Sequence, residues 1–136
     1  MISNPKHGWC NFKLGDFEGT PSYLTNVPMD LLDAFIDYYT RGYDAAFFDE
    51  EGSEFMLLLM WHGVYIIEEK DDAKLHTFYD LIVEDLTEEV ITDIVCNLDG
   101  WCDNFVRYDC QMNQELSEQF KCLLEDRANE LRNIIK

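Results

Sequence analysis

The stretch that decides the fold is residues 54–68, EFMLLLMWHGVYIIE. Its first half, Glu54 to Trp61, is a near-continuous apolar run, which is typical of a β-strand covered on both faces. His62 and Gly63 separate this run from a second β-rich segment, Val64 to Glu68. A short break of this kind between two such segments predicts a tight β-hairpin. A sheet built on this hairpin is therefore the centre of the predicted fold.

Further strands are predicted on both sides of the hairpin. Asp44 to Phe48 is a short strand, and Asp49 to Gly52 is predicted to be the turn that joins it to the hairpin. Part of Leu75 to Val83 is β-rich and predicts a fourth strand after the hairpin. Residues 8–14 predict a first strand, whereas the glycines and proline of residues 15–22 indicate a loop.

Three helices complete the prediction. The first begins near Pro28, which suits a first helical position, and ends at Gly42, a good terminator. The second is predicted to be capped by Thr87, and the third covers residues 113–135 and packs on the sheet. The sequence thus predicts a single α+β domain spanning residues 1–136. Its mostly antiparallel sheet of about four or five strands packs against three helices.

The charge of the chain is unevenly distributed. Residues 14–106 hold 22 of the 28 acidic residues but only three basic ones, Arg41, Lys70 and Lys74. These residues sum to −19, so the segment accounts for the whole of the formal net charge of −18. A fold does not need such an imbalance, because self-repulsion opposes compaction. The segment predicts a basic protein partner, and it disfavours nucleic acid and anionic membranes, which select for Lys and Arg.

Sequence motifs for catalysis, cofactors or metals are not found. The five cysteines, at positions 10, 96, 102, 110 and 122, contain no C-x-x-C pair, which predicts free thiols in a reducing cytoplasm. The three histidines, His7, His62 and His76, form no metal-binding pattern. Residues 1–10 lack the apolar segment of a secretion signal, and no apolar run approaches the roughly 20 residues of a membrane span. A cytoplasmic protein without catalytic, cofactor or metal-binding residues is expected.

The candidate binding residues lie on the first predicted helix and in the turn that follows the next strand. Asp30, Asp33 and Asp37 recur at i, i+3 and i+7, so they share a helix face on which no basic residue is expected. Tyrosines near the end of this helix would suit a partly wet interface, where tyrosine is a common anchor. A solvated helix face is the alternative explanation of the stripe. The predicted partner-binding residues are Asp30, Asp33, Asp37, Tyr38, Tyr43, Glu50 and Glu51.

Two further acidic clusters lie at predicted connections between strands, at residues 49–51 and 68–72. Clustered carboxylates can bind a hard cation, since Ca²⁺ takes six to eight oxygen ligands. Neither cluster follows the EF-hand order of acids around a central glycine. Solvated loops that keep neighbouring strand edges apart are therefore expected instead.

Size, acidity and the lack of a catalytic motif resemble the bacterial immunity proteins of polymorphic-toxin and contact-dependent inhibition systems. The resemblance is one of type over the whole chain, and it carries no residue roles. It implies an intracellular inhibitor that occludes a basic partner such as a toxin nuclease. Three alternatives remain open: a nucleic-acid-mimicking protein of a phage or mobile element, an enzyme or metal-binding domain, and a plain interaction module whose acidity serves solubility alone.

Overall fold

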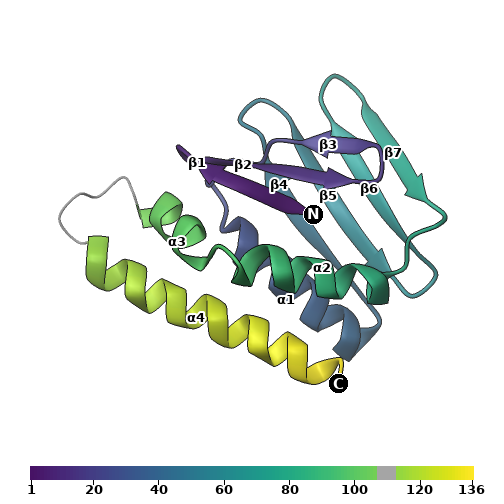
Figure 1. Cartoon of the computed structure of the whole chain (residues 1–136). Coiled ribbons are helices and arrows are strands. Elements are labelled where there is room, and N and C mark those ends of the chain that lie inside the picture. Colours follow the sequence, from purple (N-terminus) through teal and green to yellow (C-terminus); the bar gives the residue numbers. More distant parts are fainter. Residues whose placement is uncertain (107–112) are drawn as a thin grey trace.

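A computed structural model describes residues 1–106 and 113–136 and contains, within them, two antiparallel sheets and four helices (Figure 1). In chain order the elements are β1 (Ile2–Lys6), β2 (Trp9–Leu14), β3 (Phe17–Gly19), α1 (Val27–Arg41), β4 (Tyr43–Asp49), β5 (Glu54–Met60), β6 (Gly63–Glu69), β7 (Ala73–Phe78), α2 (Val83–Val95), α3 (Leu98–Val106) and α4 (Asn113–Ile134). The predicted α+β class is confirmed. The described residues hold seven strands in two sheets and four helices, where the sequence predicts about four or five strands and three helices.

The larger sheet has the order β4-β5-β6-β7 and is built by three successive antiparallel hairpins. Met60 pairs with Gly63, so Trp61 and His62 alone form the turn of the predicted hairpin. The predicted hairpin and the strand before it are therefore confirmed, and the fourth strand ends at Phe78, before residues 79–82, which lead into α2.

The smaller sheet has the order β1-β2-β3, and only its middle strand is predicted from the sequence. Residues 8–14 correspond to β2, whereas β3 lies inside the predicted loop of residues 15–22. The two sheets meet through aromatic rings: the Phe12 ring centroid lies 4.9 Å from that of Phe55 and 5.5 Å from that of Phe48. All three side chains are almost fully buried, so this contact forms the centre of the core between the sheets.

Helix α1 confirms the prediction for the first helix. Pro28 lies in its first turn, where a backbone N–H would have no intrahelical acceptor. The N–H that proline lacks therefore costs the helix no hydrogen bond. Leu31 and Phe35 lie on its buried face, and the helix contacts β4 and β5 of the larger sheet. Gly42 ends the helix with φ of 88°, a left-handed conformation that glycine adopts without strain, and its N–H donates to the Tyr38 carbonyl at 2.7 Å.

Helix α2 begins at Val83, four residues before the predicted cap. Thr87 lies inside the helix and is buried; its hydroxyl donates to the Val83 carbonyl at 2.8 Å. The Tyr39 hydroxyl in turn hydrogen bonds the Thr87 oxygen at 2.8 Å, which ties α1 to α2. The predicted cap at Thr87 is therefore wrong, because this threonine satisfies its hydroxyl within the helix instead of at its start.

Helix α2 is also joined to β1 and α3. The Met1 ammonium group lies 2.6 Å from a carboxylate oxygen of Glu89 and 2.6 Å from one of Asp93. The Asp93 backbone carbonyl accepts a hydrogen bond from the indole N–H of Trp101 at 3.1 Å. Burial opposes protonation of the Met1 amine, but its bonds to both carboxylates outweigh that effect and raise its pKa. These contacts connect segments that are far apart in the sequence.

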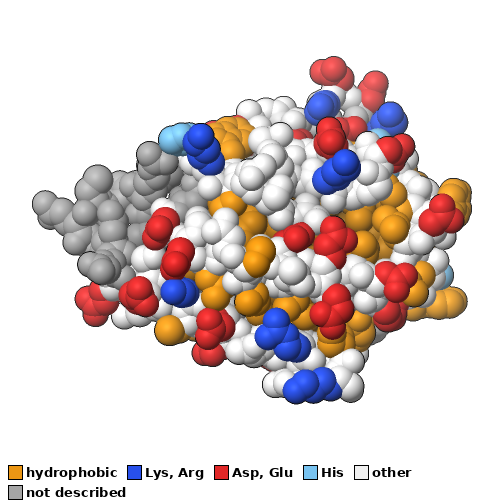
Figure 2. All heavy atoms as spheres, viewed as in Figure 1, with side chains coloured by type: hydrophobic (Ala, Val, Ile, Leu, Met, Phe, Trp, Pro, Cys, Tyr) orange, Lys and Arg blue, Asp and Glu red, His pale blue; other side chains and the backbone are white. Residues whose placement is uncertain are grey.

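Helix α4 confirms the last predicted helix but packs differently from the prediction. It lies mainly against α1, α2 and α3 rather than on a sheet (Figure 1). Leu124, Ala128 and Leu131 are fully buried, whereas Leu123 on the same helix is 60% exposed. The face formed by the three-stranded sheet, α2 and α4 carries basic side chains among its carboxylates (Figure 2). Of the described helices, none has the length and apolar character needed to cross a membrane.

Candidate functional site

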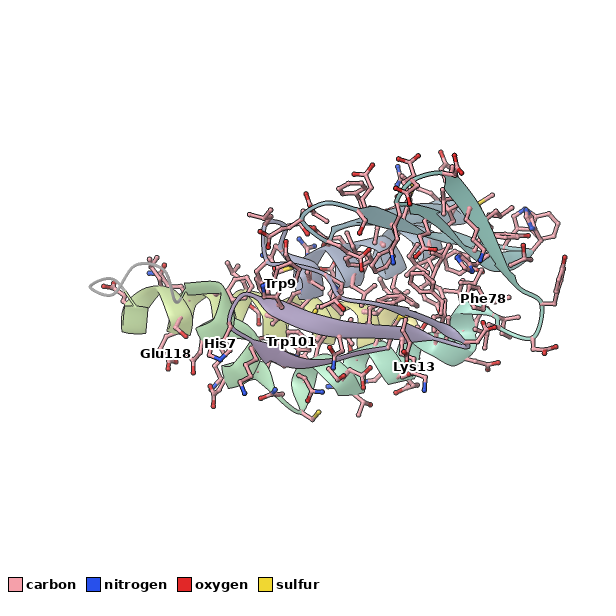
Figure 3. All side chains as sticks on the ribbon, turned by 90° about the horizontal axis from the view of Figure 1, so that it is seen from above. His7, Trp9, Lys13, Phe78, Trp101 and Glu118 are labelled. Carbon is pink, nitrogen blue, oxygen red and sulfur yellow. The ribbon has the colours of Figure 1, made fainter. Side chains whose placement is uncertain are left out.

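One face of the four-stranded sheet is left uncovered. Side chains alternate across a strand, so Phe55, Leu57 and Leu59 point to the core and are buried. Met56 and Leu58 point to the opposite side and are only partly buried. The three-stranded sheet and the helices lie on the inner side, and none of the described elements covers the other side (Figure 3). The expectation that this apolar strand is covered on both faces is therefore wrong.

We call this surface the outer sheet face. Its apolar and aromatic members are Tyr43, Ala45 and Phe47 of β4, Met56, Leu58 and Met60 of β5, Tyr65 and Ile67 of β6, and Leu75 of β7. Phe47 is 40% exposed and Leu75 is 61% exposed. Four strands about 4.8 Å apart and about 3.3 Å of rise per residue give a face of roughly 400 Å². Apolar patches of this size on a monomer are commonly functional.

Exposed aromatic side chains gather at one end of this face. Trp61, in the β5–β6 turn, is 78% exposed, and Tyr79, just after β7, is 91% exposed. The His62 ring lies 5.0 Å from the Trp61 ring, and His62 Nδ1 hydrogen bonds the Tyr65 hydroxyl at 3.0 Å. Exposed tryptophan and tyrosine are the side chains that most often anchor protein interfaces.

Carboxylates gather at the opposite end. Asp49 of β4 pairs with Glu54 of β5, which pairs with Glu69 of β6, so one row of three carboxylates crosses three strands. We call this the carboxylate row. The two acidic clusters that the sequence places in separate loops are thus brought together by the antiparallel hairpins. The row borders an open depression of about 250 Å³. That depression is lined by Asp49, Gly52, Ser53, Glu54, Glu69 and Lys70.

The carboxylate row is electrostatically unfavourable in the free protein. Like charges directly opposite each other on neighbouring strands destabilise a sheet. A shared hydrogen bond with Glu69 is the main cause that raises the pKa of Glu54, and the charges of Glu69 and Asp49 raise it further. Glu69 and Asp49 therefore disfavour the charged form of Glu54 in the folded chain.

This repulsion leads to a stability prediction for Glu54→Gln. A carboxyl whose pKa is raised on folding contributes stability that is present below its unfolded pKa and is lost as pH rises through the folded pKa. At pH 7 the glutamine variant is therefore expected to melt at a higher temperature than the wild type, because its amide can donate to Glu69. Near pH 4 the difference should vanish. Thermal melts followed by circular dichroism at both pH values measure this.

Glu51→Gln is the matched control, since Glu51 is exposed and lies in the adjacent turn outside the carboxylate row. It removes the same charge without relieving the row, so it should change the melting temperature less than Glu54→Gln does. A Glu54→Gln variant that melts at or below the wild-type temperature at pH 7 contradicts the assignment of repulsion to this row.

The predicted aspartate stripe of α1 is partly neutralised by basic side chains of α4 and of α1 itself. Arg127 of α4 places its Nε 3.0 Å from Asp33 Oδ1, and Arg41 at the end of α1 lies 3.7 Å from Asp37. Burial is the main cause that raises the pKa of Asp33, and Arg127 opposes it. Burial and the charge of Asp33 raise the pKa of Asp30. Arg127 is a neighbour that the sequence of α1 does not reveal, whereas Arg41 belongs to α1 itself, so the expectation of a face without a basic residue is wrong.

The other predicted binding residues are spread over the fold. Tyr38 is buried, its hydroxyl donates to Glu84 at 3.1 Å, and burial together with Glu84 raises its pKa to about 12. Tyr43 begins β4 on the outer sheet face. Glu50 accepts a hydrogen bond from the Thr20 N–H at 2.8 Å and so holds the β4–β5 turn, while Glu51 is exposed. The structure does not bring these residues together in one surface, and their contact with a partner stays a prediction.

The described thiols are divided between core and surface. Burial raises the pKa of Cys10 and of Cys102 to about 12, so both stay protonated at neutral pH. Cys96 and Cys122 are exposed, and all four of these thiols are free. Cys110 lies outside the described residues. Within residues 1–106 and 113–136, no group of three or more His, Cys, Asp or Glu side chains is placed to hold a metal ion.

The outer sheet face is not identified from the sequence, although the unbroken apolar run of β5 carries a signal of it. Such a run needs cover on two sides, and the fold supplies it on one. No protein-family model, curated protein or solved structure matches this chain.

Proposed function

We propose that this chain is a small acidic binding protein that inhibits a basic protein partner in the cytoplasm by covering its surface. The observation that carries the proposal is the outer sheet face, an uncovered apolar surface that ends in the carboxylate row. A net charge of −18 attracts a cationic partner over long range and speeds the encounter. A toxin nuclease, whose own substrate is polyanionic, is the kind of partner that such a surface would occlude.

The apolar centre of the surface favours a specific inhibitor over a nucleic-acid mimic. A mimic needs carboxylates spaced like phosphates along an extended surface, because phosphate contacts dominate nucleic-acid affinity. Here the carboxylates of the row lie at one end of the sheet, and apolar side chains such as Phe47 and Leu75 occupy the rest. Apolar contacts give a protein partner affinity that charge alone does not supply.

The test is inhibition of a basic toxin nuclease domain, taken from the gene next to the one that encodes this chain. Equimolar chain is expected to stop cleavage of a nucleic-acid substrate. The association rate constant should fall by about 10- to 100-fold between 50 and 500 mM NaCl, because salt screens the attraction.

An unrelated basic DNA-binding domain of similar charge serves as the control. A specific inhibitor should leave it free to bind DNA, whereas a nucleic-acid mimic would capture both proteins. Nuclease that stays active in the presence of excess chain, or association that ignores salt, contradicts the proposal.

A further inference from the structure

We infer that the partner docks on the outer sheet face, and that the docking element is a basic segment of a protein. Its apolar side chains would cover the centre of that face, and its Lys or Arg side chains would pair with the carboxylate row. The inference rests on the proposed function and gives it a location. Asp33 and Asp37 of the α1 stripe then pair with cations of the fold itself.

The first support is the one-sided cover of the four-stranded sheet. Met56 and Leu58 of β5 and Ile67 of β6 lie in the middle of the sheet with no described element over them. A sheet with apolar residues on both faces normally has cover on both. The face of roughly 400 Å² is about half of what one partner buries in a standard interface of about 800 Å² per side. The acidic turns beside it and the aromatic end can extend the contact.

The second support is charge complementarity. Glu54 lies between Asp49 and Glu69 in the carboxylate row, and Glu51, Asp71 and Asp72 are exposed in the adjoining turns. Among the residues that the structure describes, the basic side chains on these hairpin ends are Lys70 and Lys74. A cationic side chain placed over the row would relieve the repulsion that the free protein contains. The chemistry at this end therefore selects Lys or Arg.

Other occupants fit less well. A second copy of the chain would bring another net charge of −18 to the interface. Two such faces together would bury about 800 Å², which is the size of a crystal contact rather than of a stable dimer. Nucleic acids and anionic membranes carry the same sign of charge as the carboxylate row and would be repelled.

The α1 stripe is a weaker candidate for the same role. Asp33 already pairs with Arg127 at 3.0 Å, and Asp37 lies near Arg41, which also contacts Asp44 at 3.1 Å. A partner would have to compete with these internal cations. In the described structure, no Arg side chain forms an ion pair with the carboxylate row.

The experiment uses a defined peptide, so it does not depend on finding the partner. A ten-residue peptide of alternating Leu and Arg is titrated into ¹⁵N-labelled chain at 50 mM NaCl and followed by NMR. Peptides of alternating Ser and Arg, and of alternating Leu and Glu, test charge alone and apolar contact alone. The Leu/Arg peptide is expected to bind most tightly and to shift resonances of β4 to β7, since it satisfies both features.

Two pairs of matched variants locate the binding. Leu75→Ser on β7 is compared with Leu123→Ser on α4, because the two leucines are 61% and 60% exposed. The triple variant Asp49→Asn/Glu54→Gln/Glu69→Gln is compared with Asp30→Asn/Asp33→Asn/Asp37→Asn, which removes the same charge. Affinity for the Leu/Arg peptide should fall about 10-fold or more in each sheet variant and less than about 3-fold in each control.

The outcomes separate the inference from the proposed function. Shifts on α1 and α4, equal loss in both charge variants, or equal binding of the Ser/Arg peptide would overturn the inference while nuclease inhibition still stood. Sedimentation of the free chain as a dimer that Leu75→Ser abolishes would assign the face to a second copy. Circular dichroism of each variant shows that it is folded, and the Leu75→Ser and charge variants test the face independently.

Discussion

Replacing Phe12 with alanine is expected to lower the free energy of unfolding by about 3–5 kcal/mol, the usual cost of removing a buried aromatic ring. Phe12 is 1% exposed, and its ring centroid lies within 6.0 Å of the rings of Phe17, Phe48 and Phe55. The ring fills the space between the two sheets, where the surrounding aromatic side chains cannot close the cavity fully. Such a loss is a large part of the roughly 5–15 kcal/mol that typical domains possess.

Urea denaturation followed by tryptophan fluorescence measures the loss, and Phe47→Ala is its control. Phe47 is the neighbour of Phe48 on β4 but points to the outer sheet face, where it is 40% exposed. The same atoms are removed there, but far less buried area is lost, so we expect a cost below about 1 kcal/mol. Equal losses from the two variants would show that the two sheets do not pack through Phe12.

Gly19→Ala is expected to destabilise the fold by about 1–3 kcal/mol, even though alanine is usually the better residue in a strand. A Cβ at Gly19 would lie 2.6 Å from Cε1 of Phe55, which is closer than van der Waals contact allows. Phe55 is 1% exposed and packs against the rings of Phe12, Phe17 and Phe48, so it has no free space to move into. The backbone of β3 would have to shift away from the larger sheet.

A double-mutant cycle with Phe55→Leu tests this explanation. Leucine shortens the side chain that the new methyl group meets, so Gly19→Ala should cost less in that background than in the wild type. The two costs come from urea denaturation of all four proteins. If Gly19→Ala costs the same with Phe55 and with leucine at that position, the close approach of β3 to Phe55 is not its cause.

Local signals explain which elements could be predicted from the sequence. Helix α1 is bounded by Pro28 and Gly42, and its apolar residues recur with helical spacing. The β5–β6 hairpin is an apolar run, a two-residue turn and a second β-rich run within a few residues of each other. Each of these features depends on neighbours along the chain, so no knowledge of the fold is needed to read them.

The missed strands depend on contacts that are distant in sequence. β1 contains Pro5, has an irregular register against β2 between Ser3 and Lys6, and is tied at Met1 to carboxylates of α2. β3 has three residues and owes its place to the packing of Phe17 against Phe55. Neither segment has the alternating pattern that marks a strand on its own.

The candidate site could be predicted only in part from the sequence, for the same reason. The acidity of the turns around Glu50 and residues 68–72 is plain in the sequence, but the alignment of Asp49, Glu54 and Glu69 requires the strand register. The helical spacing of Asp30, Asp33 and Asp37 gives no sign that Arg127 of α4 lies beside Asp33. An apolar strand also does not reveal that every described helix packs on one side of its sheet.

The uncovered sheet face also governs the colloidal behaviour of the free protein. At neutral pH a charge of −18 keeps molecules apart, although each one exposes Phe47 and Leu75 to water. As the pH falls towards the isoelectric point of about 4.2, the carboxylates take up protons and this mutual repulsion ends. The apolar side chains are unaffected by acid, so precipitation should be greatest there. In the free state the negative charge therefore prevents self-association through this surface.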